Sequence, residues 1–435
     1  MKTAAVICEY NPFHNGHRYQ LEYIKEKLSA DFVVSIMSGN FVQRGEPALI
    51  DKYERTRTAL INGADLVLEI PTVFAASSAA EFAAAGVGVA VKSGIIDMLC
   101  FGTEGGTVLE DIRQYAGLIY SGNNSYHRVA ARLLSSDSSD KTSDYNALIQ
   151  QYLKSGETYP KAVSLAAESI YGIEKASKLS LPNNILAAAY INALSHPEKF
   201  FPLGEIPAHA ADIKPFAIER KGSGYADPSL GDGLASASAL RSFIFNEAAE
   251  IDRISELSSY VPLDMLEALT KAAGENRLIS GNNLSLLLSA RLLDASAKGI
   301  DLGTYLDVSR EIADRLNNNA DRIMSFDERT AFTKTRQYTY SRISRALLHI
   351  TLGITNKEFN ERKAHGYINY LRILGFRQDA AEKGLLKELK TKALVPVVTK
   401  PADHKELISR DIYFDQFYWS LKSQKGEYER PPVIV

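Results

Sequence analysis

Cysteine and tryptophan are scarce in this chain of 435 residues, which contains two cysteines and one tryptophan. Two cysteines cannot form a disulfide framework, and no Cys-x-x-Cys pair or His/Cys cluster has the spacing of metal ligands. Cys8 and Cys100 each lie in a short apolar run, which favours buried free thiols in a reducing compartment. We therefore expect neither a disulfide-stabilised secreted protein nor a protein-bound metal.

Long hydrophobic runs are also missing. The best candidate for a membrane span, residues 70–91, is interrupted by Pro71 and Glu81, and only ten uncharged residues separate Glu81 from Lys92. A spanning helix needs about 20 apolar residues. No targeting segment is recognisable, so the sequence predicts a cytoplasmic protein without a membrane partner.

The whole chain has no excess of charge of one sign, because 50 Lys and Arg oppose 52 Asp and Glu for a net charge of −2. That balance argues against a strongly basic DNA-binding protein, and we expect no DNA partner. The charge is unevenly distributed, however. Residues 329–377 carry ten Lys and Arg but only two Glu, a net charge of +8, which leaves −10 for the rest of the chain.

The first 110 residues alternate between short apolar runs and helical patterns. Strands are predicted at Ala4–Cys8, Phe32–Met37, Leu66–Ile70 and Met98–Phe101, and helices at His17–Leu28, Lys52–Asn62 and Ser77–Val91. After a helical stretch, a fifth strand is predicted at Ala217–Arg220. This alternation predicts an α/β fold with a five-stranded parallel sheet. Ligands of such sheets bind at the carboxyl ends of the strands.

The clearest chemical motif follows the first predicted strand. Residues 14–17 read H-x-G-H, with His14 and His17 on either side of Gly16. A helix that begins there offers free N–H groups to an anion, and two imidazoles can donate hydrogen bonds to phosphate oxygens. The alternative is a pair of capping or surface histidines. The position between strand and helix favours nucleotide binding.

A second motif opens the helix predicted after the fifth strand. Residues 236–241 contain Ser236, Ser238 and Arg241. Two hydroxyls, the first N–H groups of a helix and a guanidinium can together hold phosphates. Taken alone, the segment is more typical of an ordinary serine N-cap, and its position after the fifth predicted strand, downstream of the histidine motif, is what favours phosphate binding.

These motifs resemble those of the nucleotidylyltransferase superfamily, in which H-x-G-H follows the first strand of a Rossmann-like sheet. Longer blocks are similar to one bacterial family, the tRNA(Met) cytidine acetate ligases. The blocks are Glu9–His17, Met37–Phe41, Gln43–Pro47, Ala64–Pro71, Phe101–Glu104, Pro182–Leu186 and Thr335–Arg345. The resemblance covers residues 1 to about 380. Ala187, where the resemblance leads us to expect glycine, departs from the family pattern.

The resemblance implies an enzyme that activates acetate with ATP to acetyl-adenylate and then acetylates N4 of the wobble cytidine of elongator tRNA(Met). ATP and acetate would be substrates, tRNA the partner, and Mg²⁺ a candidate companion of the ATP. His14, His17, Ser236, Ser238 and Arg241 would be catalytic. The implied ATP site comprises Gly102, Asn183, Arg220 and the segment Ile7, Cys8, Glu9, Tyr10, Asn11, Pro12, Phe13, His14, Asn15, Gly16, His17, Arg18, Tyr19 and Gln20.

The implied domains are a nucleotidylyltransferase-like catalytic domain at 1–250 with a helical insertion at about 107–200, an α-helical tRNA-binding region at 251–390, and a small segment at 391–435. The residues themselves support the RNA partner. Lys334, Tyr338, Arg342, Arg345 and His349 are spaced 4, 4, 3 and 4 apart, which predicts one face of a helix over 330–350. A cationic face with tyrosine suits RNA, although a solvated surface is the simpler alternative. With Arg336, the first four of these are the candidate tRNA contacts.

Two other functions remain open at this point. A small-metabolite adenylyltransferase would share both phosphate motifs but would not need the basic segment. An RNA-binding protein could use the nucleotide site as a sensor. Arg44, between the second strand and second helix, is a candidate for phosphate or tRNA contact, and Glu46 and Asp51 are candidates for ordering that loop.

Overall fold

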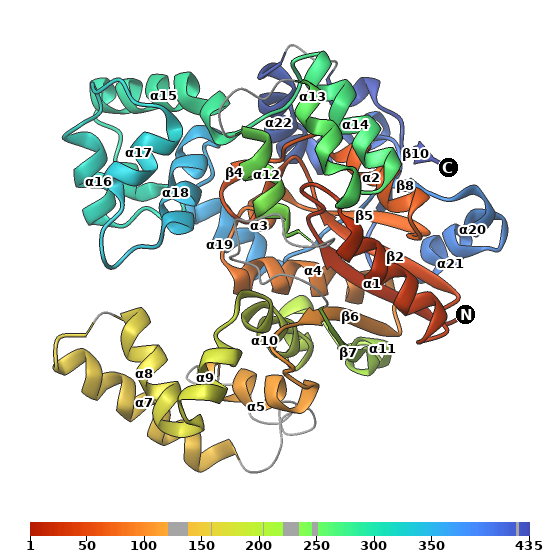
Figure 1. The fold of residues 1–435 in the computed structure, drawn as a ribbon, viewed down its shortest axis with the longest axis horizontal. Coiled ribbons are helices and arrows are strands. Elements are labelled where there is room, and N and C mark those ends of the chain that lie inside the picture. The colour runs from red at the N-terminus through yellow and green to blue at the C-terminus, as the bar shows by residue number, and fades with distance from the viewer. Residues whose placement is uncertain (121–137, 158, 203, 221–234, 246–250, 423–425) are drawn as a thin grey trace.

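A mostly parallel β-sheet forms the centre of the molecule and carries helices on both faces (Figure 1). The computed structural model describes residues 1–120, 138–157, 159–202, 204–220, 235–245, 251–422 and 426–435. The sheet consists of β1 (Thr3–Cys8), β2 (Phe32–Ser38), β5 (Leu66–Ile70), β6 (Met98–Thr103), β7 (Lys214–Glu219), β8 (Leu371–Phe376), β9 (Val397–Val398) and β10 (Val433–Ile434). β3 (Phe41–Val42) and β4 (Glu46–Pro47) form a separate hairpin.

The strand order is β10-β8-β5-β2-β1-β6-β7, with β9 paired to β8. β5, β2, β1, β6 and β7 are parallel, as predicted. The chain runs outward from β1 through β2 to β5 and then crosses to β6 on the other side of β1. The order therefore reverses between β1 and β6, and the carboxyl ends of these two strands mark the expected ligand site.

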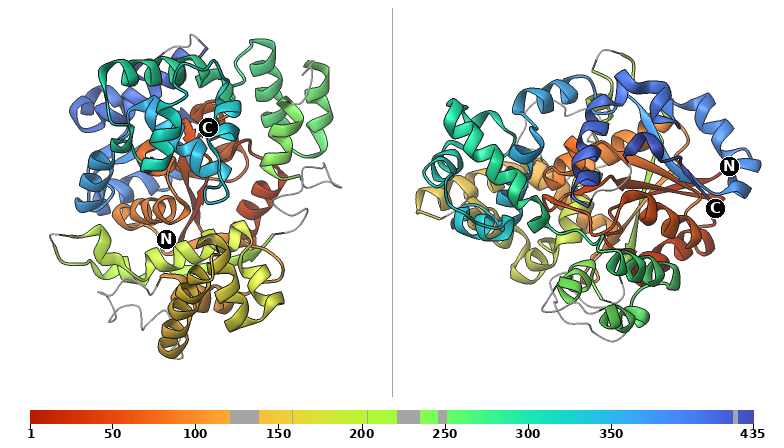
Figure 2. Two further views of the ribbon diagram at one scale, coloured as in Figure 1. Left: turned by 90° about the vertical axis from the view of Figure 1, so that its left-hand side faces the viewer. Right: turned by 90° about the horizontal axis from the view of Figure 1, so that it is seen from above.

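Helices cover both faces because the crossovers on the two sides of β1 run in opposite directions. α1 (Asn15–Glu26) and α2 (Lys52–Ile61) pack on one face, and α4 (Ala79–Ser93) and α10 (Pro182–Leu194) on the other (Figure 2). β1, β2 and β5 are buried along their whole length. Strands covered on both faces are continuous apolar runs, which is why these three were predictable from the sequence.

The helical insertion follows β6. It contains α5 (Leu109–Tyr120), α7 (Ser138–Lys154), α8 (Tyr159–Tyr171), α9 (Ile173–Leu179) and α10. α7 and α8 project from the sheet in the yellow part of Figure 1. α10 returns to the sheet and packs against α4 and β6. Residues 121–137 of the predicted insertion lie outside the described part of the chain.

The chain beyond β7 is mostly helical, as predicted. Its helices include α12 (Ala237–Phe245), α14 (Leu263–Gly274), α15 (Ser285–Lys298), α16 (Arg310–Asn317), α17 (Phe326–Thr333), α18 (Tyr340–Leu352), α19 (Asn356–Ala364), α20 (Gln378–Glu382), α21 (Leu385–Lys392) and α22 (Lys405–Ser420). α15 to α18 form a group of their own beside the sheet (Figure 1).

The single helix predicted over 330–350 is wrong. α17 ends at Thr333 and α18 begins at Tyr340, with a non-helical link between them. The Oγ1 atom of Thr339 accepts the N–H of Arg342 at 3.3 Å and so caps α18. A threonine that bonds to the backbone in this way favours a helix start over a helix interior.

Five strands were predicted, and the main sheet contains three more. β8 lies inside the stretch 251–390, for which helices were predicted, and pairs antiparallel to β5. Its Arg372 and Gly375 are atypical of a buried strand. Arg372 is nevertheless 2% exposed, because Glu69, Asp415 and Glu427 surround its guanidinium.

Arg372 belongs to a buried ion cluster that joins distant parts of the chain. Lys52 of α2 lies 2.7 Å from Glu69 of β5, 2.6 Å from Asp415 of α22 and 3.1 Å from Glu427. All five side chains are at most 6% exposed. Removing one partner from such a cluster would leave an uncompensated buried charge. The cluster therefore fixes the C-terminal segment to the central sheet.

Among the described helices, none combines the length and the apolarity that a membrane crossing requires.

Candidate functional site

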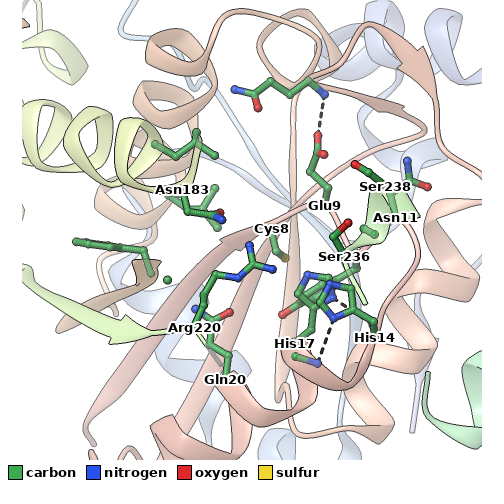
Figure 3. A pocket seen from close by; sticks show the side chains of 18 of the residues that line it. Cys8, Glu9, Asn11, His14, His17, Gln20, Asn183, Arg220, Ser236 and Ser238 are labelled. Carbon is green, nitrogen blue, oxygen red and sulfur yellow. Dashed lines mark hydrogen bonds between the residues drawn. The ribbon is translucent and has the colours of Figure 1, made fainter. Parts of the chain in front are cut away.

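A pocket lies at the carboxyl ends of β1, β6 and β7, where the strand order reverses (Figure 3). Its lining includes most of the predicted ATP-site residues, namely Ile7, Cys8, Glu9, Tyr10, Asn11, His14, Gly16, His17, Tyr19, Gln20, Gly102, Asn183 and Arg220. The five predicted catalytic residues line it as well. Pro12, Phe13, Asn15 and Arg18 are not among its lining residues. Segments far apart in the sequence thus meet at one site.

His14 and His17 hold each other in place at the start of α1. The Nδ1 atom of His14 accepts the N–H of Gly16 at 3.1 Å, and Nδ1 of His17 accepts the N–H of His14 at 3.2 Å. The rings stack with their centres 3.7 Å apart. Because each Nδ1 is an acceptor, this network assigns the ring proton of each neutral imidazole to Nε2. Both rings can therefore donate a hydrogen bond to a ligand.

Both imidazoles are held neutral. Burial and, to a smaller extent, the charge of Arg220 together lower the pKa of His14 to about 3. Burial also lowers the pKa of His17 well below its usual range, helped by His14 and Arg220. A neutral Nε2–H donor suits a phosphate that is already opposed by nearby guanidinium groups.

Gly16 gives the His14 ring the space that it occupies. A Cβ atom at residue 16 would lie 2.9 Å from Cε1 and 3.0 Å from Nδ1 of His14. The glycine therefore leaves room for the His14 ring to fold back onto the helix start. Gly102 plays a similar part on β6, where a Cβ atom would lie 3.0 Å from Cγ of Arg220.

The second motif has the predicted place at the pocket. Ser236 is buried, and its Oγ accepts the N–H of Ala239 at 3.2 Å, so it is the N-cap of α12. Ser238 lines the pocket. Nη1 of Arg241 donates to the carbonyl of Asn11 at 2.7 Å, and Nη2 lies 3.4 Å from Glu46. The serine is thus a cap and a pocket residue at once, and Arg241 ties α12 to the histidine loop.

Two side-chain amides in the lining have donors without a partner. The Oδ1 atom of Asn11 accepts the N–H of Leu49 at 2.8 Å, but its buried Nδ2 makes no hydrogen bond. The buried Nδ2 of Asn183 is also unpartnered. Buried donors are rarely left unsatisfied in native proteins. Both therefore indicate a ligand with acceptor atoms, such as a base, a ribose or a phosphate.

Several lining residues were missed by sequence reasoning. They are Gln43, Phe82, Phe101, Leu186, Tyr190, Ile218, Glu219, Ala235 and Ala237. Arg44, named from the sequence only as a candidate for phosphate or tRNA contact, also lines the pocket. Asp51 orders its loop as predicted, because its side chain accepts the N–H groups of Tyr53 and Glu54 and caps α2.

A groove continues from the pocket toward the basic segment. The two share Gln43, Arg44, Leu186, Ser238 and Arg241. Farther along, the groove is lined by Ser280–Asn282 and by residues of the α18 start, including Ser341, Ser344 and Arg345. The turn between β3 and β4 fixes this geometry, because the carbonyl of Gly45 accepts the hydroxyl of Ser344 at 2.9 Å.

The five candidate tRNA contacts lie in different settings. Lys334 and Arg336 are exposed in the link between α17 and α18. Tyr338 is half-buried and bonds to Ser309, and the Arg342 guanidinium lies 4.9 Å from the centre of the Tyr338 ring. Arg345 is paired with Asp307 at 3.1 Å.

His349 does not belong to an exposed basic face. It is fully buried, and its ring nitrogens lie 3.0 Å from the carbonyls of Leu306 and Ala76. The prediction that His349 shares an exposed helix face with Lys334, Tyr338, Arg342 and Arg345 is therefore wrong. Contact between tRNA and the remaining cations of the link and of α18 stays a prediction.

Comparison with known proteins identifies the family. The HIGH Nucleotidyl Transferase family model matches residues 1–139 and 125–430. A tRNA(Met) cytidine acetate ligase of Thermoanaerobacter sp. is 34% identical over 96% of this chain and 93% of its own length. One from Clostridium botulinum is 31% identical over 100% of this chain and 99% of its own length. The chain belongs to the tRNA(Met) cytidine acetate ligase family.

A solved structure of the family agrees. The crystal structure of Thermotoga maritima TmcAL bound with alpha-thio ATP matches with a TM-score of 0.80 and 27% identity, covering 100% of both chains. The apo form of the same protein matches with a TM-score of 0.83 and 28% identity, also over 100% of both chains. The predicted family, fold class and enzyme class are therefore confirmed.

Proposed function

We propose that this chain activates acetate with ATP to acetyl-adenylate, releases pyrophosphate, and transfers the acetyl group to N4 of the wobble cytidine of elongator tRNA(Met). Membership of the ligase family supports the overall reaction. The observation that supports the two-step route is that the pocket and the groove are continuous. A pocket with neutral imidazole donors opens into a groove lined by Arg44, Arg241 and Arg345.

Activation suits the pocket because acetate needs a better leaving group before an amine can attack it. The carboxylate oxygen attacks the α-phosphorus of ATP, and pyrophosphate leaves. In this proposal, His14, His17 and the first N–H groups of α12 donate to phosphate oxygens as charge moves onto the leaving group. Arg220 adds a cation at the end of β7. The protein positions reactants and neutralises charge, and the route needs no covalent enzyme intermediate.

The residues assigned to ATP are those that line the pocket, with the unpartnered amides of Asn11 and Asn183 as donors to the nucleotide. Mg²⁺ is proposed only as a companion of ATP. Among the described residues, no group of three or more His, Cys, Asp and Glu side chains could hold a metal ion. We assign such an ion to the phosphates of ATP, because Mg²⁺ usually binds substrate phosphates and keeps several of its waters.

Acetate-dependent exchange of labelled pyrophosphate into ATP, measured without tRNA, tests the activation step. We expect exchange only when acetate is present. Exchange that requires a phosphorylated metabolite instead of acetate would favour the adenylyltransferase alternative, and ATP binding without any exchange would favour a nucleotide sensor. The groove beyond the pocket favours the ligase, since a small metabolite would not need it.

A further inference from the structure

Glu9 lines the pocket and bonds to a residue that lines both the pocket and the groove. It follows β1 directly, and its Oε1 atom accepts the backbone N–H of Gln43 at 2.7 Å. Gln43 lines both cavities. In Figure 3 the Glu9 side chain points away from His14 and His17. Its carboxylate therefore lies beside a residue shared by the pocket and the groove, on the side away from the histidines.

Proton acceptors are scarce in this lining. The Nδ1 atoms of His14 and His17 already accept backbone N–H groups, and their Nε2 atoms carry protons. Among the described residues that line the pocket, the carboxylates are those of Glu9 and Glu219. Glu219 is exposed at the end of β7, whereas Glu9 is half-buried. Glu9 is thus the less exposed of the two carboxylates in the described lining.

The surroundings of Glu9 favour proton uptake even though cations face it. Burial raises the pKa of Glu9 and outweighs the opposing effects of the Gln43 N–H and of Arg241, Arg44 and Arg55. Cys8, on β1, and Tyr190, on α10, are the other titratable groups that interact with it. Arg55 donates to the Glu9 carbonyl at 2.6 Å, which fixes the backbone. A carboxylate with a raised pKa is a stronger base than an ordinary glutamate.

The second half of the proposed reaction needs such a base. Acetate attacks ATP as an anion and loses no proton, but the exocyclic amine of cytidine must lose one. We propose that Glu9 is the proton acceptor for acetyl transfer, an assignment that rests on the proposed function. The N4 amine attacks the acetyl carbon and forms the C–N bond. The bond from that carbon to the AMP oxygen breaks, AMP leaves with the electron pair, and the N4 proton passes to the Glu9 carboxylate.

The two half-reactions can be measured separately in the full-length enzyme. Glu9→Gln keeps the shape of the side chain and can still accept the Gln43 N–H, but it cannot take up the proton. We expect single-turnover acetyl transfer to tRNA to fall about 100-fold more than acetate-dependent pyrophosphate exchange does, the size typical of a lost general base. Glu9→Asp, which keeps the carboxylate, should recover part of the transfer rate.

The pH profile gives a second readout. The base must be ionised, so the rate of wild-type acetyl transfer should fall as the pH falls through the raised pKa of Glu9. This fall is the acid limb of the pH profile. The Glu9→Gln variant should lack this acid limb. Glu46→Gln removes the other carboxylate beside Arg241 and serves as the control. It should change both half-reactions in the same proportion and keep the acid limb.

Three results would overturn the assignment to Glu9. They are an equal loss of exchange and transfer in Glu9→Gln, an acid limb that persists in this variant, and loss of the limb in Glu46→Gln. Failure of the proposed function looks different, because wild-type enzyme would then show no acetate-dependent exchange at all.

Discussion

At the scale of single residues, the site depends on two histidines that are used as neutral groups. Each Nδ1 atom is occupied by a backbone N–H of the helix start, so each ring presents Nε2–H. The spacing of three residues lets the two rings close this reciprocal arrangement, and Gly16 leaves the space it needs. Positively charged histidines would repel each other at a ring separation of 3.7 Å. The folded structure therefore requires both histidines to be uncharged.

This neutrality predicts a loss of stability in acid. The unfolded chain binds protons at its histidines near pH 6.5, whereas folded His14 has a pKa of about 3. The unfolded state therefore binds more protons below pH 6.5, and the free energy of unfolding falls as the pH falls toward the folded value. For His14 alone, the loss at pH 5 should be about 2 kcal/mol.

Urea unfolding at pH 7 and pH 5 measures this effect. His14→Asn should lose less stability than the wild type between the two pH values. His365, which is exposed directly after α19, provides the control, because His365→Gln should keep the wild-type pH dependence. The same pH dependence in all three proteins would contradict a buried neutral His14.

At the scale of elements, the sequence predicts the strands and motifs whose signal lies within one short segment of the chain. β1, β2 and β5 are apolar runs between helices, and the H-x-G-H motif is contiguous. β8 could not be predicted, because Arg372 is tolerated in it only through partners more than 40 residues away in the sequence. Gln43 and Tyr190 reach the pocket only through the fold. The break between α17 and α18 rests on the cap at Thr339, which helical spacing does not reveal.

The prediction at this scale concerns the cations of the link between α17 and α18 and of the first turn of α18. In the described structure, no ion pair joins Lys334, Arg336 or Arg342 to a carboxylate, so these cations are available to phosphates. Arg342→Ala should weaken tRNA binding and lower the slope of log affinity against log salt by about 1. Filter binding at several salt concentrations measures both quantities.

Lys357 is the matched control for Arg342. It belongs to the same +8 stretch and is exposed, but it lies one turn from Glu361 with the charged atoms 3.9 Å apart. Lys357→Ala should leave the salt slope of tRNA binding unchanged. A wild-type slope in Arg342→Ala would move the RNA surface away from the start of α18.

At the scale of the whole molecule, the +8 stretch is largely neutralised by residues from elsewhere. Arg372 faces Glu69 and Glu427, Arg362 pairs with Asp411, and Lys363 pairs with Glu81. A charge counted along the sequence is therefore not the charge of a surface. What remains are the cations of the link between α17 and α18, whose last residue, Thr339, lines the groove that begins in the pocket. The same ion pairs hold the C-terminal part of the chain against the sheet.

Incubation of unmodified elongator tRNA(Met) with the protein, ATP and isotopically labelled acetate, followed by mass spectrometry of the tRNA nucleosides, tests acetyl transfer most directly. We predict labelled N4-acetylcytidine at the wobble position, formed only when ATP and acetate are both present. An unlabelled wobble cytidine under these conditions, with folded protein that binds both ATP and tRNA, would contradict the proposed function.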